Sequence, residues 1–260
     1  MMSETLLIHR DGAVCTLTLN RPKLRNAVDA DTMLALRDAI VDCGEEIRVI
    51  VITGAGGAFC SGADLTVAAQ GELSPEAAVA ILTDAYHPAL LAIREARCPV
   101  IAAVDGVAAG IGCDLALACD LRLVSEQARF AELFVQVGLV PDGGGTWSLP
   151  RIIGLGRALD LMYTAMPVDA HEALTIGLAN RVFPNERFEQ EVAAYAAYLA
   201  EQAPLSLMRI RRAVYAAQDG TYAEALSREA NFQREIFTSE DGFEGFRAFL
   251  EKRKPVWKGR

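Results

Sequence analysis

The stretch AAVDGVAAGIGCDLALACD, from Ala102 to Asp120, decides the fold predicted for this chain. It is made almost entirely of small or apolar residues, yet it contains three glycines and three aspartates. Because glycine tolerates tight turns and lets a ligand approach the main chain, Gly106, Gly110 and Gly112 predict turns around a buried helix at 112–118. A glycine turn that opens a helix leaves backbone N–H groups unpaired at the positive end of the helix dipole. The stretch therefore predicts a position that stabilises an anion.

Strand and helix patterns alternate on both sides of this stretch, which predicts an α/β fold. A turn at Asp11-Gly12 joins the first two strands into a hairpin. One helix is expected to begin after Asp29 and to end near Gly44, and a long one begins at Ser74-Pro75. Beyond residue 154 the pattern is helical, with one strand-like segment. The expected strands are 5–9, 14–20, 49–53, 100–104, 121–124 and 180–183.

Composition places the chain among folded, cytoplasmic proteins. Its 260 residues are 52% hydrophobic, enough for a large core, and its formal net charge of −9 argues against binding nucleic acid or an anionic membrane. No secretory signal is visible, and three aspartates interrupt the most apolar window, 98–124. The six cysteines form no C-x-x-C pair, so we expect neither disulfides nor a metal site.

The simplest division of the chain is an α/β core at 1–200 and a helical region at 201–260. Pro204, Thr221 and Ser239 mark the starts of successive helices in that second region. The last helix carries an apolar face formed by Phe243, Phe246, Phe249 and Leu250. Such a face could pack on the core of its own chain or on a neighbouring subunit, and the pattern does not choose between the two.

Two glycine-containing loops, each following a buried strand, are candidates for an oxyanion hole. The first is the segment 61–65 and the second is Gly110-Ile111-Gly112. Taken alone, either loop can be an ordinary connection. Together they can direct two N–H donors at one carbonyl oxygen, which stabilises a reaction that builds negative charge there. Neither loop has the pattern of a phosphate or dinucleotide site.

Asp114 and Asp142 are the candidate acid–base residues. An aspartate in the apolar helix at 112–118 is either buried for structural reasons or a tuned acid facing a pocket. Asp142, in PDGGG, has an ordinary alternative as a turn former or helix N-cap. The three histidines are scattered, and the Cys60 thiol has no visible activating partner, so nucleophilic catalysis is not favoured.

Five segments, in order along the whole chain, resemble the enoyl-CoA hydratase/isomerase, or crotonase, family. This resemblance implies a spiral of ββα units followed by C-terminal helices that form trimers or hexamers. It also implies an acyl-CoA thioester substrate, with coenzyme A as part of the substrate and no separate cofactor. The segments are RPKLRNAV (21–28), GAFCSGADL (57–65), AVDGVAAGIGCDLALACDLRL (103–123), VGLVPDGGGTWSLPRIIG (137–154) and FRAFLEKRKPVWKGR (246–260).

The resemblance also implies roles for individual residues. The backbone N–H groups of Ala63 and Ile111 correspond to the family's oxyanion hole, although many members have glycine where this chain has Ile111. Basic residues near the C-terminus of a neighbouring subunit often reach the coenzyme A phosphates; here Lys252, Arg253, Lys254 and Lys258 are the candidates. The expected substrate-binding residues are Lys23, Leu24, Arg25, Ala27, Ser61, Gly62, Asp64, Leu65, Thr66, Gly110, Phe134 and Gly138.

Departures from the family pattern favour one branch of it. Hydratases of the family use two glutamates; the first corresponds to Asp114 and the second to Phe134, which cannot transfer a proton. Asp142 stands where hydratases commonly have glycine, and its PDGGGTW context is similar to the isomerase-type branch. We therefore expect an enoyl-CoA isomerase with Asp142 as proton shuttle. The alternatives are an enoyl-CoA hydratase and a non-catalytic member that binds acyl-CoA or RNA.

Overall fold

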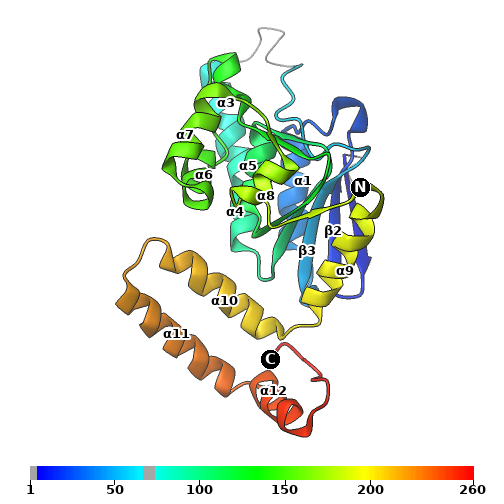
Figure 1. Cartoon of the computed structure of the whole chain (residues 1–260), viewed down its shortest axis with the longest axis vertical. Coiled ribbons are helices and arrows are strands. Elements are labelled where there is room, and N and C mark those ends of the chain that lie inside the picture. Colours follow the sequence, from blue (N-terminus) through cyan, green and yellow to red (C-terminus); the bar gives the residue numbers. More distant parts are fainter. Residues whose placement is uncertain (1–4, 67–73) are drawn as a thin grey trace.

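The computed structural model describes residues 5–66 and 74–260 of the chain (Figure 1). Its strands are β1 (Leu6–Asp11), β2 (Val14–Leu19), β3 (Val49–Gly54), β4 (Val100–Val104), β5 (Val107–Ala109), β6 (Leu121–Ser125), β7 (Arg129–Ala131), β8 (Val168–Asp169) and β9 (Arg181–Phe183). Its helices include α1 (Ala30–Val41), α3 (Pro75–Ile81), α4 (His87–Glu95), α5 (Ile111–Ala118), α6 (Gly145–Ile153), α7 (Leu155–Thr164), α8 (Ala170–Thr175), α9 (Phe188–Ala200), α10 (Pro204–Ala217), α11 (Tyr222–Phe237) and α12 (Glu240–Glu251).

The main sheet has six strands in the order β1-β2-β3-β4-β6-β9. The first two strands form the predicted antiparallel hairpin, with Asp11 opposite Val14, and the other neighbours pair in parallel. Alternate residues of β3 face opposite sides of the sheet: Ile50 and Ile52 join the core that includes α1, α4 and α5, while Val49 and Val51 pack against α9. Both faces of the sheet are therefore covered, as parallel strands require.

A second sheet, in the order β5-β7-β8, was not predicted. Each of its strands has at most three residues, too short to carry an alternation of apolar and polar side chains. The prediction of a single strand beyond residue 154 was accordingly wrong, because β8 lies there as well as β9. The small sheet matters for the site, since β5 leads directly into Gly110 and α5.

The predicted long helix runs from Pro75 to Glu95 and contains a π-helical segment, Leu82–Tyr86, between α3 and α4. Its second half is buried at Tyr86, Leu90 and Ile93, whereas Val79, in the first half, is exposed. In the part of the chain that the structure describes, this is the one helix that is long and apolar enough to cross a membrane. Length and composition of a single helix are weak evidence for a membrane span. The second half of this helix, α4, packs on α1 and α5.

The helices α10, α11 and α12 extend away from the α/β core, and α10 and α11 lie side by side (Figure 1). The residues between α9, which ends at Ala200, and α10, which begins at Pro204, contain the expected boundary between 200 and 201, and the division itself stays a prediction. The apolar face of α12 does not pack on the core of its own chain: Phe243, Phe246, Phe249 and Leu250 are all exposed. Of the two alternatives for this face, packing on a neighbouring subunit is the one that stays open.

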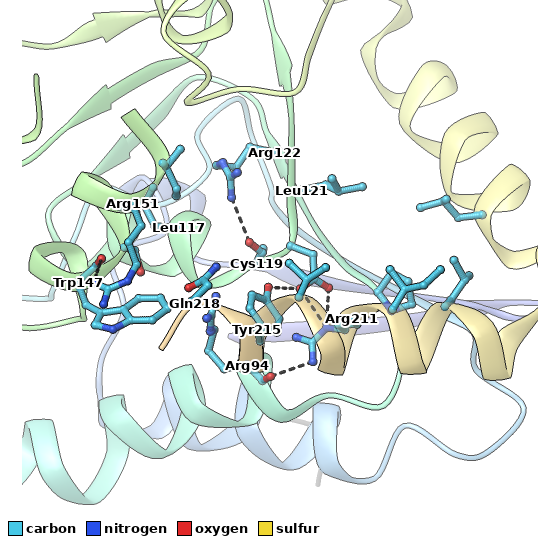
Figure 2. Close-up of a pocket in the computed structure, with 18 residues that line it drawn as sticks. Arg94, Leu117, Cys119, Leu121, Arg122, Trp147, Arg151, Arg211, Tyr215 and Gln218 are labelled. Carbon is cyan, nitrogen blue, oxygen red and sulfur yellow. Dashed lines mark hydrogen bonds and ion pairs between the residues drawn. The ribbon is translucent and has the colours of Figure 1, made fainter. Parts of the chain in front are cut away.

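Arg211 joins α10 to the core. Its Nε lies 3.0 and 2.8 Å from the two carboxylate oxygens of Asp120, which also accepts a hydrogen bond from the Tyr215 hydroxyl (Figure 2). Its remaining N–H groups donate to three carbonyl oxygens at the end of α4, those of Ile93, Arg94 and Ala96. The guanidinium thus supplies donors to carbonyls at the C-terminus of helix α4, where the Ile93 O also accepts the Ala96 N–H.

Replacing Arg211 by Met is expected to lower the free energy of unfolding by about 3–5 kcal/mol, the usual cost of removing one partner of a buried ion pair. The measurement is urea unfolding followed by circular dichroism. Arg212→Met is the matched control, because Arg212 is the exposed neighbour on the same helix; its effect should stay within about 0.5 kcal/mol. Equal stabilities of the two variants would contradict this role of Arg211.

Candidate active site

The two glycine loops predicted from the sequence lie against each other. The Cys60 N–H donates to Val107 O and the Ala109 N–H donates to Cys60 O, each at 2.9 Å. A Cβ on Gly112 would overlap the Cys60 carbonyl oxygen and stand 2.7 Å from Cys60 Cβ, so the close approach requires glycine at 112. The loop after β3 is thereby fixed to β5 and to the first turn of α5.

Both predicted oxyanion donors are left available by this arrangement. Gly110, with φ of 51°, makes the turn that starts α5, and its own N–H donates to Ala131 O. Ile111 is the first residue of α5, so its N–H has no partner inside the helix. On the other loop, Val28 bonds to Gly62 O and to Asp64 N–H on either side of Ala63. Within the described residues, neither the Ala63 N–H nor the Ile111 N–H makes a hydrogen bond.

The two segments expected to line coenzyme A are brought together. Ser61 donates its N–H to Arg25 O and its hydroxyl to Leu24 O, both at 3.0 Å. Lys23, Leu24 and Arg25 are exposed beside this junction, and Arg25 adopts a left-handed conformation with φ of 49°. The Ala27 carbonyl accepts a hydrogen bond from Arg21. Leu65 and Thr66, which follow Asp64, are exposed.

Asp64 has a structural task at this junction. Its Oδ2 is 2.7 Å from an Arg21 nitrogen, and its Oδ1 accepts hydrogen bonds from the backbone N–H and the hydroxyl of Thr66. These hydrogen bonds to Thr66 and Arg21 hold the pKa of the Asp64 carboxyl below its usual value. Asp64 therefore stabilises the loop that carries Ala63.

Phe134 lies beside the second loop. It is buried in the 3-10 helix Leu133–Val137, and its Cζ would be 3.9 Å from a Cβ on Gly110. Gly138 ends this helix in a left-handed conformation, and the Leu139 N–H donates to Phe134 O. Gly110 and Phe134, both expected to bind substrate, thus lie close together, while Gly138 forms the turn that follows.

The basic residues near the C-terminus are remote from these loops in the chain itself. They follow or end α12, at the opposite end of the molecule from α3 (Figure 1). Arg253 pairs with Glu244 and Glu251, and Lys258 pairs with Glu240. The prediction that such residues serve the site of a neighbouring subunit stays a prediction for Lys252, Arg253, Lys254 and Lys258.

Asp114 is buried in the first turn of α5, with 1% of its surface exposed. Its Oδ2 accepts a hydrogen bond of 3.0 Å from the Gly143 N–H, next to Asp142, and its Oδ1 is buried with no partner among the described residues. Burial, followed by repulsion from Glu132, raises the pKa of the Asp114 carboxyl well above its usual range. A carboxyl group in such a place is a candidate for proton transfer.

Glu132 is the buried acid that the sequence reasoning missed. It follows β7 directly, is 2% exposed, and both of its carboxylate oxygens are buried without a partner among the described residues. Burial raises the pKa of Glu132 to about 7, and Asp142 adds to the effect. A glutamate after a short apolar segment has no distinctive signature, so only its burial near Asp114 of α5 could reveal it.

Asp142 lies at the edge of the same group. It is half-buried, and its Oδ1 is fully buried without a partner in the described part of the chain. The N-cap of α6 is Gly144, not Asp142, so the ordinary capping role is wrong. Burial raises the pKa of the Asp142 carboxyl, and His87 opposes this shift.

The helix 75–95 holds both halves of the site in position. His87 Nε2 is 2.9 Å from the Asp142 carbonyl oxygen, and the Tyr86 hydroxyl donates to Val28 O at 2.8 Å. These two residues lie where the π-helical segment passes into α4, and π-bulges occur often at functional sites. This contact of His87 could not be predicted from the sequence, because a π-helical step has no sequence signature.

Other features of the structure do not coincide with this site. A cavity of about 420 Å³ lies where α10 meets the core, lined in part by Arg94, Trp147 and Tyr215, and it contains none of the predicted site residues (Figure 2). The Cys60 thiol is buried, which raises its pKa to about 12 and agrees with a packed, unreactive cysteine. No group of three or more metal-ligating side chains occurs in residues 5–66 and 74–260.

Comparisons with known proteins agree with the geometry. The family model described as enoyl-CoA hydratase/isomerase matches residues 9–260. The chain is 38% identical over 260 residues to a Rhodobacter capsulatus protein named "Probable enoyl-CoA hydratase" and 35% identical over 262 residues to the 1,2-epoxyphenylacetyl-CoA isomerase of Escherichia coli, with all of each chain covered.

A solved structure of a related protein has the same fold as this chain. The enoyl-CoA hydratase from Bacillus anthracis superposes with a TM-score of 0.94 at 30% identity, covering 98% of this chain and 100% of that one. The predicted α/β fold of the crotonase type is thereby confirmed. With its glycine loops, its parallel sheet and a family match from residue 9 to the last residue, the chain belongs to the enoyl-CoA hydratase/isomerase family.

Proposed function

We propose that this protein is an enoyl-CoA isomerase that shifts a double bond of an acyl-CoA thioester. The observation that carries the proposal is the Asp142 carboxylate, with a buried, unpartnered oxygen. Asp142 lies near the buried Asp114. Asp114 is in the first turn of α5, and the first residue of that helix, Ile111, carries a candidate oxyanion donor. Phe134 stands where hydratases of the family have their second glutamate and cannot move a proton.

The proposed reaction needs one base and one oxyanion hole. The Asp142 carboxylate removes a proton from C2 of a 3-enoyl thioester, and the C–H electron pair moves towards the thioester carbonyl to form a dienolate. The N–H groups of Ala63 and Ile111 stabilise the enolate oxygen. Asp142 then returns the proton at C4, and the double bond becomes conjugated with the carbonyl. One residue serves in both roles, and no proton is consumed.

The relatives support this proposal in part. The E. coli relative at 35% identity is named an isomerase that acts on a coenzyme A thioester. Others are named hydratases, among them the crotonyl-CoA hydratase of Syntrophomonas wolfei at 34% identity. An acyl-CoA substrate is consistent with all of these names, while the reaction itself is the part we propose.

Enoyl-CoA hydration is a second candidate because of Glu132. Phe134 has no carboxylate, but Glu132, two residues earlier, has one that is buried beside Asp114. A pair of carboxyl groups is what water addition needs, one to activate the water and one to donate a proton. Binding of RNA without catalysis is not favoured, given the net charge of −9.

The two candidates are separated by one panel of assays on the purified protein. With 3-hexenoyl-CoA we expect formation of the conjugated 2-enoyl product, seen as a rise in enoyl absorbance. With crotonyl-CoA we expect a loss of absorbance at least 10-fold slower. Rapid hydration with no isomerisation, across short, long and aryl thioesters, would replace the first candidate by the second. Trimeric or hexameric assembly and a cytoplasmic location stay predictions.

A further inference from the structure

Asp114 and Glu132 meet at the start of α6, at a point kept open by a glycine. A Cβ added to Gly145 would overlap Asp114 Oδ1 and would stand 3.3 Å from Glu132 Oε1. The two carboxyl oxygens therefore face the same small space. Each belongs to a side chain that is at most 2% exposed, and each is without a hydrogen-bond partner among the described residues.

Two ionised carboxylates cannot occupy such a place without a large cost, whereas a shared proton removes it. A carboxyl group at one side can donate its O–H to a carboxylate oxygen at the other, which satisfies both orphaned acceptors at once. Asp114 Oδ2 would stay free to accept the hydrogen bond from the Gly143 N–H. The pair thus connects Glu132, through Asp114 and Gly143, to the neighbouring residue Asp142.

We propose that Glu132 is a positioning residue that shares a proton with Asp114 and thereby holds Asp114 against Gly143, which fixes the backbone that carries Asp142. This inference rests on the proposed role of Asp142 for its catalytic readout, but the shared proton itself does not. Loss of the proton at alkaline pH leaves two facing negative charges beside Gly145. Their repulsion displaces Asp114, and with it the segment that presents Asp142.

Other charged or titratable groups lie around the pair: Cys113, Asp142, His87 and Arg122. The Cys113 thiol of α5 faces Glu132, and burial raises its pKa well above the usual value, so it stays neutral. Asp142, on the segment before α6, adds negative charge, and His87 of α4 faces Asp142. Arg122 of β6 is a cation near Cys113, but it donates to the Leu178 and Cys119 carbonyl oxygens.

Two substitutions of Glu132 separate this role from a purely structural one. In the wild-type protein, kcat should fall at alkaline pH as the shared proton is lost. In Glu132→Gln, the amide can donate to Asp114 Oδ1 at every pH. Its kcat at neutral pH should therefore stay within about threefold of wild type, and the fall of kcat at alkaline pH should disappear. In Glu132→Leu no donor remains, and kcat should fall about 100-fold with little change in KM, as for a misplaced catalytic group. Glu126→Gln, an exposed glutamate on the preceding loop, is the control and should keep the wild-type pH profile.

A second measurement needs no catalytic activity. Infrared difference spectra of the resting protein, recorded across a pH titration, should show a protonated carboxyl band that disappears on the alkaline side in wild type and Glu126→Gln. The band should be absent from Glu132→Gln. A failed isomerase assay with this band present would reject the proposed function and keep the shared proton. The inference is overturned by an unchanged band or an unchanged alkaline fall in Glu132→Gln, or by equal activity of the Gln and Leu variants.

Discussion

Replacing Asp142 by Asn is expected to lower kcat for isomerisation of 3-hexenoyl-CoA by about 10²–10⁴-fold, the usual contribution of a positioned general base. Asparagine keeps the shape of the side chain but cannot accept the proton from C2. Because substrate contacts of the Ala63 and Ile111 loops are untouched, binding of a saturated thioester such as butyryl-CoA should change little. Isothermal titration calorimetry measures that binding, and enoyl absorbance measures the rate.

The dependence of kcat on pH should show the protonation of Asp142. Burial raises the pKa of Asp142, so the base should become protonated, and kcat should fall, at a pH above the ordinary value of about 3.9 for an aspartate. This acid limb should be missing from the residual activity of Asp142→Asn. Asp160→Asn is the control, because Asp160 is an exposed aspartate on α7. This variant should keep the wild-type kcat and its fall at acid pH. Undiminished turnover in Asp142→Asn would reject Asp142 as the proton shuttle.

Replacing Gly112 by Ala is expected to damage the oxyanion hole as a whole. The added Cβ would overlap the Cys60 carbonyl oxygen and stand 2.8 Å from Cys60 Sγ, and the backbone atom cannot move as a flexible side chain would. The loop that carries Ala63 must then shift away from α5. Since removal of one oxyanion donor costs about 10²–10³-fold in kcat, we expect a loss of that order in kcat/KM.

The same substitution should also lower the free energy of unfolding, by about 1–3 kcal/mol, as overpacking of a core does. Chemical denaturation and the isomerase assay are the measurements. Gly156→Ala is the matched control: nothing lies within 4 Å of the Cβ it would add, and the residue sits in the first turn of α7. A Gly112→Ala variant as active as Gly156→Ala would show that the approach of the two loops is not needed for catalysis.

Local chemistry explains which parts of the fold could be predicted. The hairpin around Asp11-Gly12, the Asp29 cap of α1 and the Ser74 cap of α3 each depend on a few neighbouring residues, and all three are present. The buried helix α5 follows in the same way, from eight consecutive residues of which only Asp114 is charged. By contrast β5, β7 and β8 have at most three residues each and are formed by pairing with one another.

The candidate site divides along a similar line. Residue patterns located the two loops and the acids Asp114 and Asp142, the resemblance to a family implied their roles, and the structure places these residues together. Contacts between distant segments decided the rest: His87 reaches the Asp142 carbonyl because of a π-helical step, and Glu132 becomes a buried acid because β7 ends against α5. None of these contacts follows from the type of residue alone.

By itself, then, the sequence predicted the strands of the main sheet, most of the helices and the glycine loops, because these depend on residue type and on spacing along the chain. The kind of chemistry was implied by the resemblance to a family. Tertiary structure alone decided that the pair of carboxyl groups at the core of the site is Asp114 and Glu132, and that the apolar face of α12 stays exposed. The physical reason is that burial and hydrogen-bond satisfaction are properties of packing. A carboxylate becomes an acid with a raised pKa only when the fold removes its water and its partners.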